Sequence, residues 1–192
     1  MKHSPSRRSV SSPLIHWNYF LAIEQDVVTL SRYVELCSNN YQTYSTELGG
    51  ILMAAAQEND VLLKQIAGNN YDNENAYRGA IPKAHPNFAK HEVEVPRFNL
   101  KFTPFAAWAQ NTTPLWWTAN NKVKHQRHTH FQNATGENTL NAVAGLLIAN
   151  IYFYSINNQL NELQPIAQLF SPVGMLDFVE FTTTGIAPCY KI

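Results

Sequence analysis

The chain has 192 residues, with 14 Lys and Arg, 14 Asp and Glu, and a formal net charge of zero. This length suits one domain with at most an appendage, and 45% hydrophobic residues can supply a sizeable core. Zero net charge excludes a surface that binds nucleic acid or membrane everywhere, so such binding must be local. The two cysteines, Cys37 and Cys189, match no ligand spacing and are typical of a reduced compartment, although a disulfide stays open.

The N-terminal residues 1–11 are basic and Ser-rich, and they lack the continuous apolar run of a signal peptide. We interpret them as a flexible lead. The longest apolar stretch, residues 142–154, is interrupted by Asn150 and is too short to span a bilayer. The sequence therefore predicts a cytoplasmic protein without membrane contact.

A first helix is predicted over residues 12–40, because a Ser-Pro pair supplies its cap and first position and an Asn-Asn pair ends it. Glu24 and Asp26 are assigned to its solvated face. A second helix is predicted over residues 45–67, closed by Gly68. Two long helices joined by a short link form an antiparallel hairpin, the basic unit of a helical bundle.

From residue 69 the composition becomes polar, and a short helix over 75–83 is possible before prolines disrupt it. Residues 91–103 alternate between apolar and polar with a period of two, which predicts a small hairpin or an extended flap. We interpret residues 69–110 as an insertion that covers one end of a helical core.

A Thr-Pro pair begins a third long helix, predicted to run from residue 114 to about 130, and a fourth follows over 137–160. Residues 166–192 are expected to form an irregular C-terminal wrap with one strand near 178–182. The predicted fold is therefore all-α: an up-and-down bundle of four to five helices over residues 12–165, with a small irregular or β-hairpin insertion.

Residues 116–131 concentrate cations, imidazoles and indoles in one stretch. No Asp or Glu occurs between Glu94 and Glu137, and three of the seven histidines lie here. Such a stretch suits local contact with phosphate or nucleotide. The candidate catalytic residues are His125, Arg127 and Lys124, and the candidate binding residues are Trp116, Trp117, Asn121, Lys122 and His128.

On one continuous helix, Trp117, Asn121, Lys124, His125 and His128 would fall on neighbouring faces. One interpretation is a phosphate-binding surface in which a histidine transfers protons, because imidazole titrates near neutral pH. The other is a solvated basic face with the indoles in the core. Both interpretations stay open on the sequence.

The spacing of His125, His128 and His130 offers three imidazoles to a metal ion. Lys124 and Arg127 would repel a cation, and no carboxylate lies nearby in the sequence to offset them. There is no Gly-rich phosphate loop, nucleophile elbow or paired-cysteine site. We therefore expect neither a metal nor another cofactor.

Glu58, Asp60 and Lys64 form a second constellation, on the second predicted helix. Either acid could orient His125 or Arg127 across the helical hairpin and set the tautomer of the imidazole. The alternative is a solvated ion pair between Asp60 and Lys64, which have the favourable spacing of four residues.

These residues resemble the HEPN superfamily of all-helical domains, and in particular HEPN-like bacterial domains with the pattern Trp-x-x-Tyr-Asn-x-x-Lys-His-x-Arg followed by Phe-x-x-Ala. The resemblance covers about residues 14–68 and 113–160. The corresponding residues here are Trp117, Asn120, Asn121, Lys124, His125, Arg127, Phe131 and Ala134.

In HEPN ribonucleases an Arg and a His on one helix cleave RNA at a site between two protomers. In this chain Asn120 stands five residues before His125, where that Arg would be. The resemblance implies a homodimer and metal-independent RNA cleavage, in a bacterial defence or toxin system with a cognate antitoxin or defence partner. The alternative function is a non-catalytic helical module that binds RNA, a nucleotide or another protein, in which the motif is structural.

Overall fold

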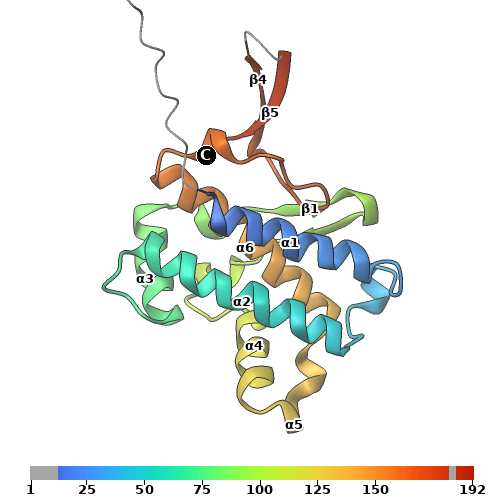
Figure 1. Cartoon of the computed structure of the whole chain (residues 1–192). Coiled ribbons are helices and arrows are strands. Elements are labelled where there is room, and N and C mark those ends of the chain that lie inside the picture. Colours follow the sequence, from blue (N-terminus) through green and yellow to red (C-terminus); the bar gives the residue numbers. More distant parts are fainter. Residues whose placement is uncertain (1–12, 182–184) are drawn as a thin grey trace, which may run out of the picture.

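One apolar helix, α6 (Gly136–Ile156), runs through the protein, and the other long helices pack around it (Figure 1). Every residue from Ala142 to Tyr152 is buried. The helix is long and apolar enough to cross a membrane, but most of it is enclosed by the rest of the protein. A helix that is apolar on all sides is stable only when it is surrounded, so α6 is the core helix of this fold.

The computed structural model describes residues 13–181 and 185–192, and within them it contains six α-helices. Helix α2 lies along α6, and α1 packs against both of these helices (Figure 1). The helices other than α6 are α1 (Ile15–Leu30), α2 (Thr46–Ala67), α3 (Glu74–Ala84), α4 (Leu115–His125) and α5 (Arg127–His130).

The predicted start and end of the second helix are both confirmed in α2. The side chain of Ser45 accepts a hydrogen bond from the backbone N–H of Leu48 at 3.1 Å, which caps the first turn. Gly68 follows the last turn with a φ of 99°, a conformation that favours glycine. The short helix predicted over 75–83 is also present, as α3.

Helix α1 is shorter than predicted, because it ends at Leu30 instead of near residue 40. The hydroxyl of Ser31 donates to the carbonyl oxygen of Val28 at 2.7 Å, and the next amides bond three residues back instead of four. These bonds tighten the last turn and satisfy the free carbonyl groups of the helix end. The predicted cap residue, Ser12, lies outside the described residues.

The predicted hairpin in the insertion is confirmed, as β1 (Val93–Val95) paired antiparallel with β2 (Leu100–Phe102). The C-terminal segment adds β3 (Ser171–Pro172) to the other edge of β1, so the strand order is β2-β1-β3. The chain is therefore mostly helical, with a small antiparallel sheet to which the insertion and the C-terminal segment both contribute.

The C-terminal segment is more regular than the irregular wrap that the sequence predicted. Strand β4 (Leu176–Phe181) pairs antiparallel with β5 (Gly185–Tyr190), and the two strands project from the body as a hairpin (Figure 1). The single strand predicted near 178–182 lies partly outside the described residues. A hairpin forms because a second strand pairs with the first, and no short-range sequence pattern here predicts that pairing.

A buried carboxylate holds the C-terminal segment on α1. Glu24 is 4% exposed, and its carboxylate accepts backbone N–H bonds from Gln168 at 3.0 Å, Leu169 at 2.9 Å and Phe170 at 3.0 Å. The assignment of Glu24 to a solvated face is therefore wrong. Three amides of a loop that has no ladder partner at this point are satisfied by one side chain.

We expect Glu24→Gln to lower the free energy of unfolding by about 2–3 kcal/mol, because a neutral amide replaces the charged acceptor of three backbone N–H groups, two of them buried. Urea unfolding followed by circular dichroism measures this change. Asp26→Asn is the matched control: Asp26 is exposed on the same helix, and the expected change is below about 0.5 kcal/mol. Equal losses in both variants would contradict the anchoring role of Glu24.

Candidate functional site

Two adjacent indoles attach α4 to the core. Trp116 is 2% exposed and Trp117 is 8% exposed. The Trp116 indole N–H donates to the carbonyl oxygen of Pro104 at 2.8 Å, and its ring lies against Gly145 of α6, where a Cβ would come within 3.4 Å. Trp116 is therefore a core residue, and its buried ring has no free face for the ligand contact that its choice as a binding residue implied.

Helix α4 ends at His125, which corrects the prediction of one helix to residue 130. Gln126 leaves the helical conformation, with φ −139° and ψ 45°, and α5 then has only four residues. The sequence has no Gly or Pro at this point. The chain turns here because it must return to Thr135, whose side chain caps the start of α6 by accepting from the N–H of Asn138.

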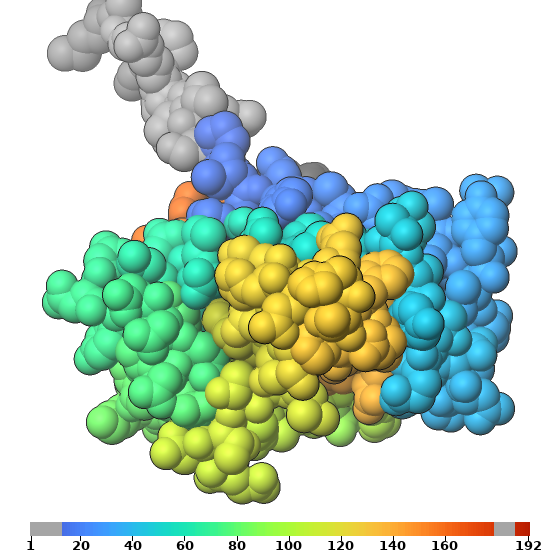
Figure 2. Space-filling view, turned by 90° about the horizontal axis from the view of Figure 1, so that it is seen from below, coloured from blue at the N-terminus to red at the C-terminus, as the bar shows by residue number. Residues whose placement is uncertain are grey.

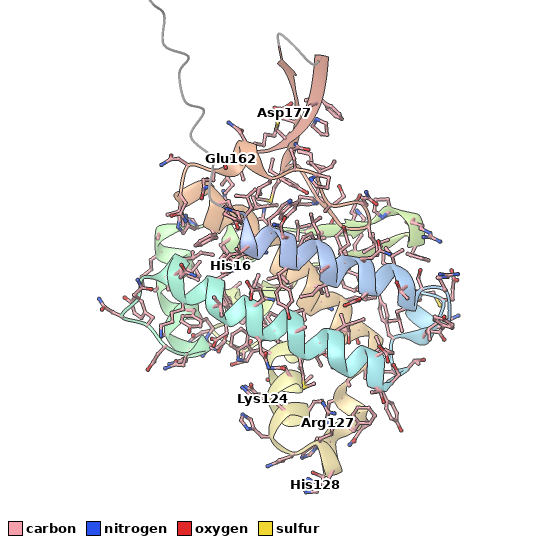
Figure 3. All side chains as sticks on the ribbon, in the orientation of Figure 1. His16, Lys124, Arg127, His128, Glu162 and Asp177 are labelled. Carbon is pink, nitrogen blue, oxygen red and sulfur yellow. The ribbon has the colours of Figure 1, made fainter. Side chains whose placement is uncertain are left out.

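The break changes which predicted site residues share a surface. His128 lies on α5 instead of on the flank of α4 that carries Asn121 and Lys124. Figure 3 shows His128 at the far end of the projection formed by α4 and α5, pointing away from the body, with Lys124 at the side of α4. The expected single flank is therefore divided into two parts.

We call the exposed charged or titratable residues of this projection the basic tip. They are Lys122, Lys124, His125, Arg127 and His128, all of them exposed. None takes part in an ion pair among the residues that the structure describes. Figure 2 looks onto the tip and shows the yellow atoms of α4 in front, beside the green atoms of the α3 region.

Within the described residues, Arg127 is the one member of the basic tip whose side chain makes a hydrogen bond to the body. Its guanidinium donates to the sulfur of Met53 on α2 at 3.3 Å and lies 5.9 Å from the centre of the Phe131 ring. These are weak, largely apolar contacts, so the charge of Arg127 is not neutralised.

The three residues predicted to orient this site have different surroundings. Glu58 pairs with His16 of α1, which corrects the expectation that it faces His125 or Arg127. Lys64 is exposed and forms no ion pair with Asp60 in the described part of the chain. Residues two apart on a helix point about 200° apart, so only one of Glu58 and Asp60 can face α4.

Asp60 faces α4 across a pocket of about 200 Å³, which we call the α2–α4 pocket. It lies where α2, the loop before α3 and α4 meet. The structure thus brings the predicted residues Asp60, Trp117, Asn121 and Lys124 together. The full lining is Ala56, Gln57, Asp60, Asp72, Asn73, Glu74, Trp117, Asn120, Asn121 and Lys124.

Two of the residues that line the pocket, Asn73 and Glu74, have structural roles. Asn73 caps α3 by accepting from the N–H of Ala76 at 3.1 Å. Glu74 is 7% exposed and accepts from the Trp108 indole at 2.8 Å, from the Arg78 guanidinium at 3.0 Å and from a threonine hydroxyl. These bonds satisfy both groups, so neither offers free capacity to a ligand.

Asp60 and Asn120 remain available. The buried hydroxyl of Tyr77 lies beside Asp60 without a hydrogen bond of normal geometry, and burial together with the Asp60 carboxylate raises the pKa of Tyr77. Asn120 is 7% exposed, and its buried side-chain oxygen has no hydrogen-bond partner among the described residues. Such an acceptor costs about 1–3 kcal/mol when left unpaired, which points to a water or a ligand.

Asn120 was not chosen as a site residue from the sequence, although it belongs to the motif. A polar residue at a helix position that faces the core is unusual unless it has a partner. That reasoning could have identified Asn120 without a structure.

No three His, Cys, Asp or Glu side chains of the described residues are placed to hold a metal ion, and His125, His128 and His130 form no such group. Comparison of the chain with protein-family models, with curated proteins and with solved structures found no match. The basic tip and the α2–α4 pocket are therefore the two features from which a function can be inferred.

The motif thus has a buried half and an exposed half, and the two halves predict different effects on stability. We expect His125→Ala to change the free energy of unfolding by less than about 0.5 kcal/mol, because the ring is exposed. Trp116→Ala should lower it by about 3–5 kcal/mol. Thermal melting measures both, and a large loss in His125→Ala would assign that histidine to the structural half.

Proposed function

We propose that the protein is an HEPN-like domain that binds RNA through the basic tip. The observation that carries this proposal is the exposure of Lys122, Lys124 and Arg127 on a projecting segment, unpaired within the described residues, in a chain whose net charge is zero. Local positive charge of this kind attracts a phosphate backbone, and its neutralisation releases counterions.

The packing of α1, α2, α4 and α6 supports the HEPN-like part of the proposal, because these are the helices that the resemblance covers. Helix α6 contacts each of the other three, and α2 contacts α4. We infer a helical bundle in which α4 presents its exposed half to the ligand.

Binding is better supported than cleavage. Proton transfer by His125 would require a cation beside it on the same face, where charge develops on the phosphate. Lys124 instead lines the α2–α4 pocket, and Arg127 contacts Met53 and Phe131. The three groups diverge within one chain. A second protomer across a dimer interface is the arrangement by which the HEPN resemblance would complete a nuclease site.

We expect fluorescently labelled single-stranded RNA to bind at low salt, and Lys122→Gln/Lys124→Gln/Arg127→Gln to weaken binding at least about tenfold. Three phosphate contacts also predict that the slope of log affinity against log salt changes by about 2. Fluorescence anisotropy over a salt series measures both quantities.

The matched control is Lys64→Gln/Lys83→Gln/Lys90→Gln, which removes three exposed lysines from other surfaces. It has the same net charge as the tip variant and should keep most of the affinity. An equal loss in the two triple variants would show that only overall charge matters. Absence of RNA binding by the unaltered protein at low salt would contradict the proposal.

Incubation of the same RNA with the protein in EDTA tests for cleavage. We expect intact RNA on a denaturing gel over a wide range of protein concentration, because the imidazole and the two cations diverge within one chain. Cleavage that disappears in His125→Ala would refute binding without catalysis. It would support the nuclease function instead, and a steep dependence on protein concentration would locate the site between protomers.

A further inference from the structure

The α2–α4 pocket adjoins the basic tip, and Lys124 belongs to both. Its volume of about 200 Å³ lies below the roughly 300–1,000 Å³ of sites for drug-sized ligands. The pocket therefore suits a single ring system or one side chain. The apolar part of its lining comes from Trp117 and Ala56, which suits a planar ring.

One wall of the pocket carries hydrogen-bond acceptors, although the Asp60 carboxylate also lies beside the Tyr77 hydroxyl. The side-chain oxygen of Asn120 is buried and unpartnered, and the carboxylate of Asp60 is in no ion pair of the described residues. A carboxylate accepts hydrogen bonds only, and it can accept two in parallel. The ligand that fits this wall presents adjacent N–H donors.

The α4 side of the pocket offers donors. Lys124 carries an ammonium group and Asn121 carries an amide, and both side chains line the pocket. The same ligand must therefore also present an acceptor. An arginine or lysine side chain from a protein partner has donors but no acceptor for the Lys124 and Asn121 donors.

Guanine has this combination of groups on one edge, namely two adjacent N–H donors and one carbonyl acceptor. Adenine and cytosine present a ring acceptor beside their amino donor, and uracil presents acceptors on both sides of its single donor. A carboxylate repels those acceptors, so Asp60 discriminates in favour of guanine.

We propose that the α2–α4 pocket receives one unstacked guanine base of a single-stranded RNA, with Asp60 and the side-chain oxygen of Asn120 accepting from its N–H groups and Lys124 donating to its carbonyl oxygen. This inference rests on the proposed function: when guanine occupies the pocket, Lys124 contacts the base, and the other cations of the basic tip bind the phosphates. The basic tip then supplies affinity and the pocket supplies base selectivity.

The experiment compares oligouridine strands that carry one central guanosine, inosine or adenosine. Inosine keeps the ring N–H and the carbonyl group but lacks the amino group. We expect the guanosine strand to bind about tenfold more tightly than the other two. Asp60→Asn should remove this preference and leave the affinity for plain oligouridine unchanged. Asp26→Asn, the same change at an exposed position on α1, should keep the preference.

Free guanosine provides a second measurement that needs no phosphate contact. Titration followed by NMR should shift the indole N–H signal of Trp117 in the unaltered protein and in Lys122→Gln/Arg127→Gln, a variant that keeps Lys124 in the pocket. Asn120→Ala should abolish the shift. Equal affinity for all three strands, with tip-dependent binding retained, would overturn the guanine inference and leave the proposed function in place. Loss of all RNA binding together with an unshifted Trp117 signal would overturn both.

Discussion

The enclosure of α6 is the constraint on which the rest of the structure depends. A 21-residue helix that is apolar on every side cannot face water, so the remaining elements are arranged to cover it. Helix α2 covers one side over its length, and α4 covers another by inserting Trp116 against Gly145. The position of α4, and with it the position of every candidate functional residue, follows from this packing.

The same packing explains why one motif supports two interpretations. A helix that lies on a core presents alternate faces to core and solvent about every half turn. Trp116 and Asn120 are buried, whereas Asn121, the next residue, and Lys124, about one turn further on, are exposed. The structural interpretation of the motif applies to its buried residues, and the binding interpretation applies to its exposed residues. The α2–α4 pocket forms at their boundary, where the buried Asn120 oxygen is left without a partner and Asp60 of α2 approaches from the other side.

Two glutamates on the long helices show how far local patterns can mislead. Glu24 and Glu58 both occupy positions that read as solvated or functional in the sequence, yet Glu24 anchors the C-terminal segment and Glu58 pairs with His16. Each interaction joins residues more than 40 positions apart. Partners at such separations are chosen by how helices rotate and pack on one another, and a helical wheel contains no information about that choice.

The sequence by itself determined the helices with strong caps, the hairpin of the insertion and the basic character of residues 122–128. Capping residues, glycine and the apolar period act over a few residues, so their effects can be predicted from the sequence alone. Only the tertiary structure decided where α1 stops, that α4 ends at His125, that β5 pairs with β4, and which of Glu58 and Asp60 meets α4. Those outcomes depend on long-range packing around α6, which competes with local preference and here overrides it.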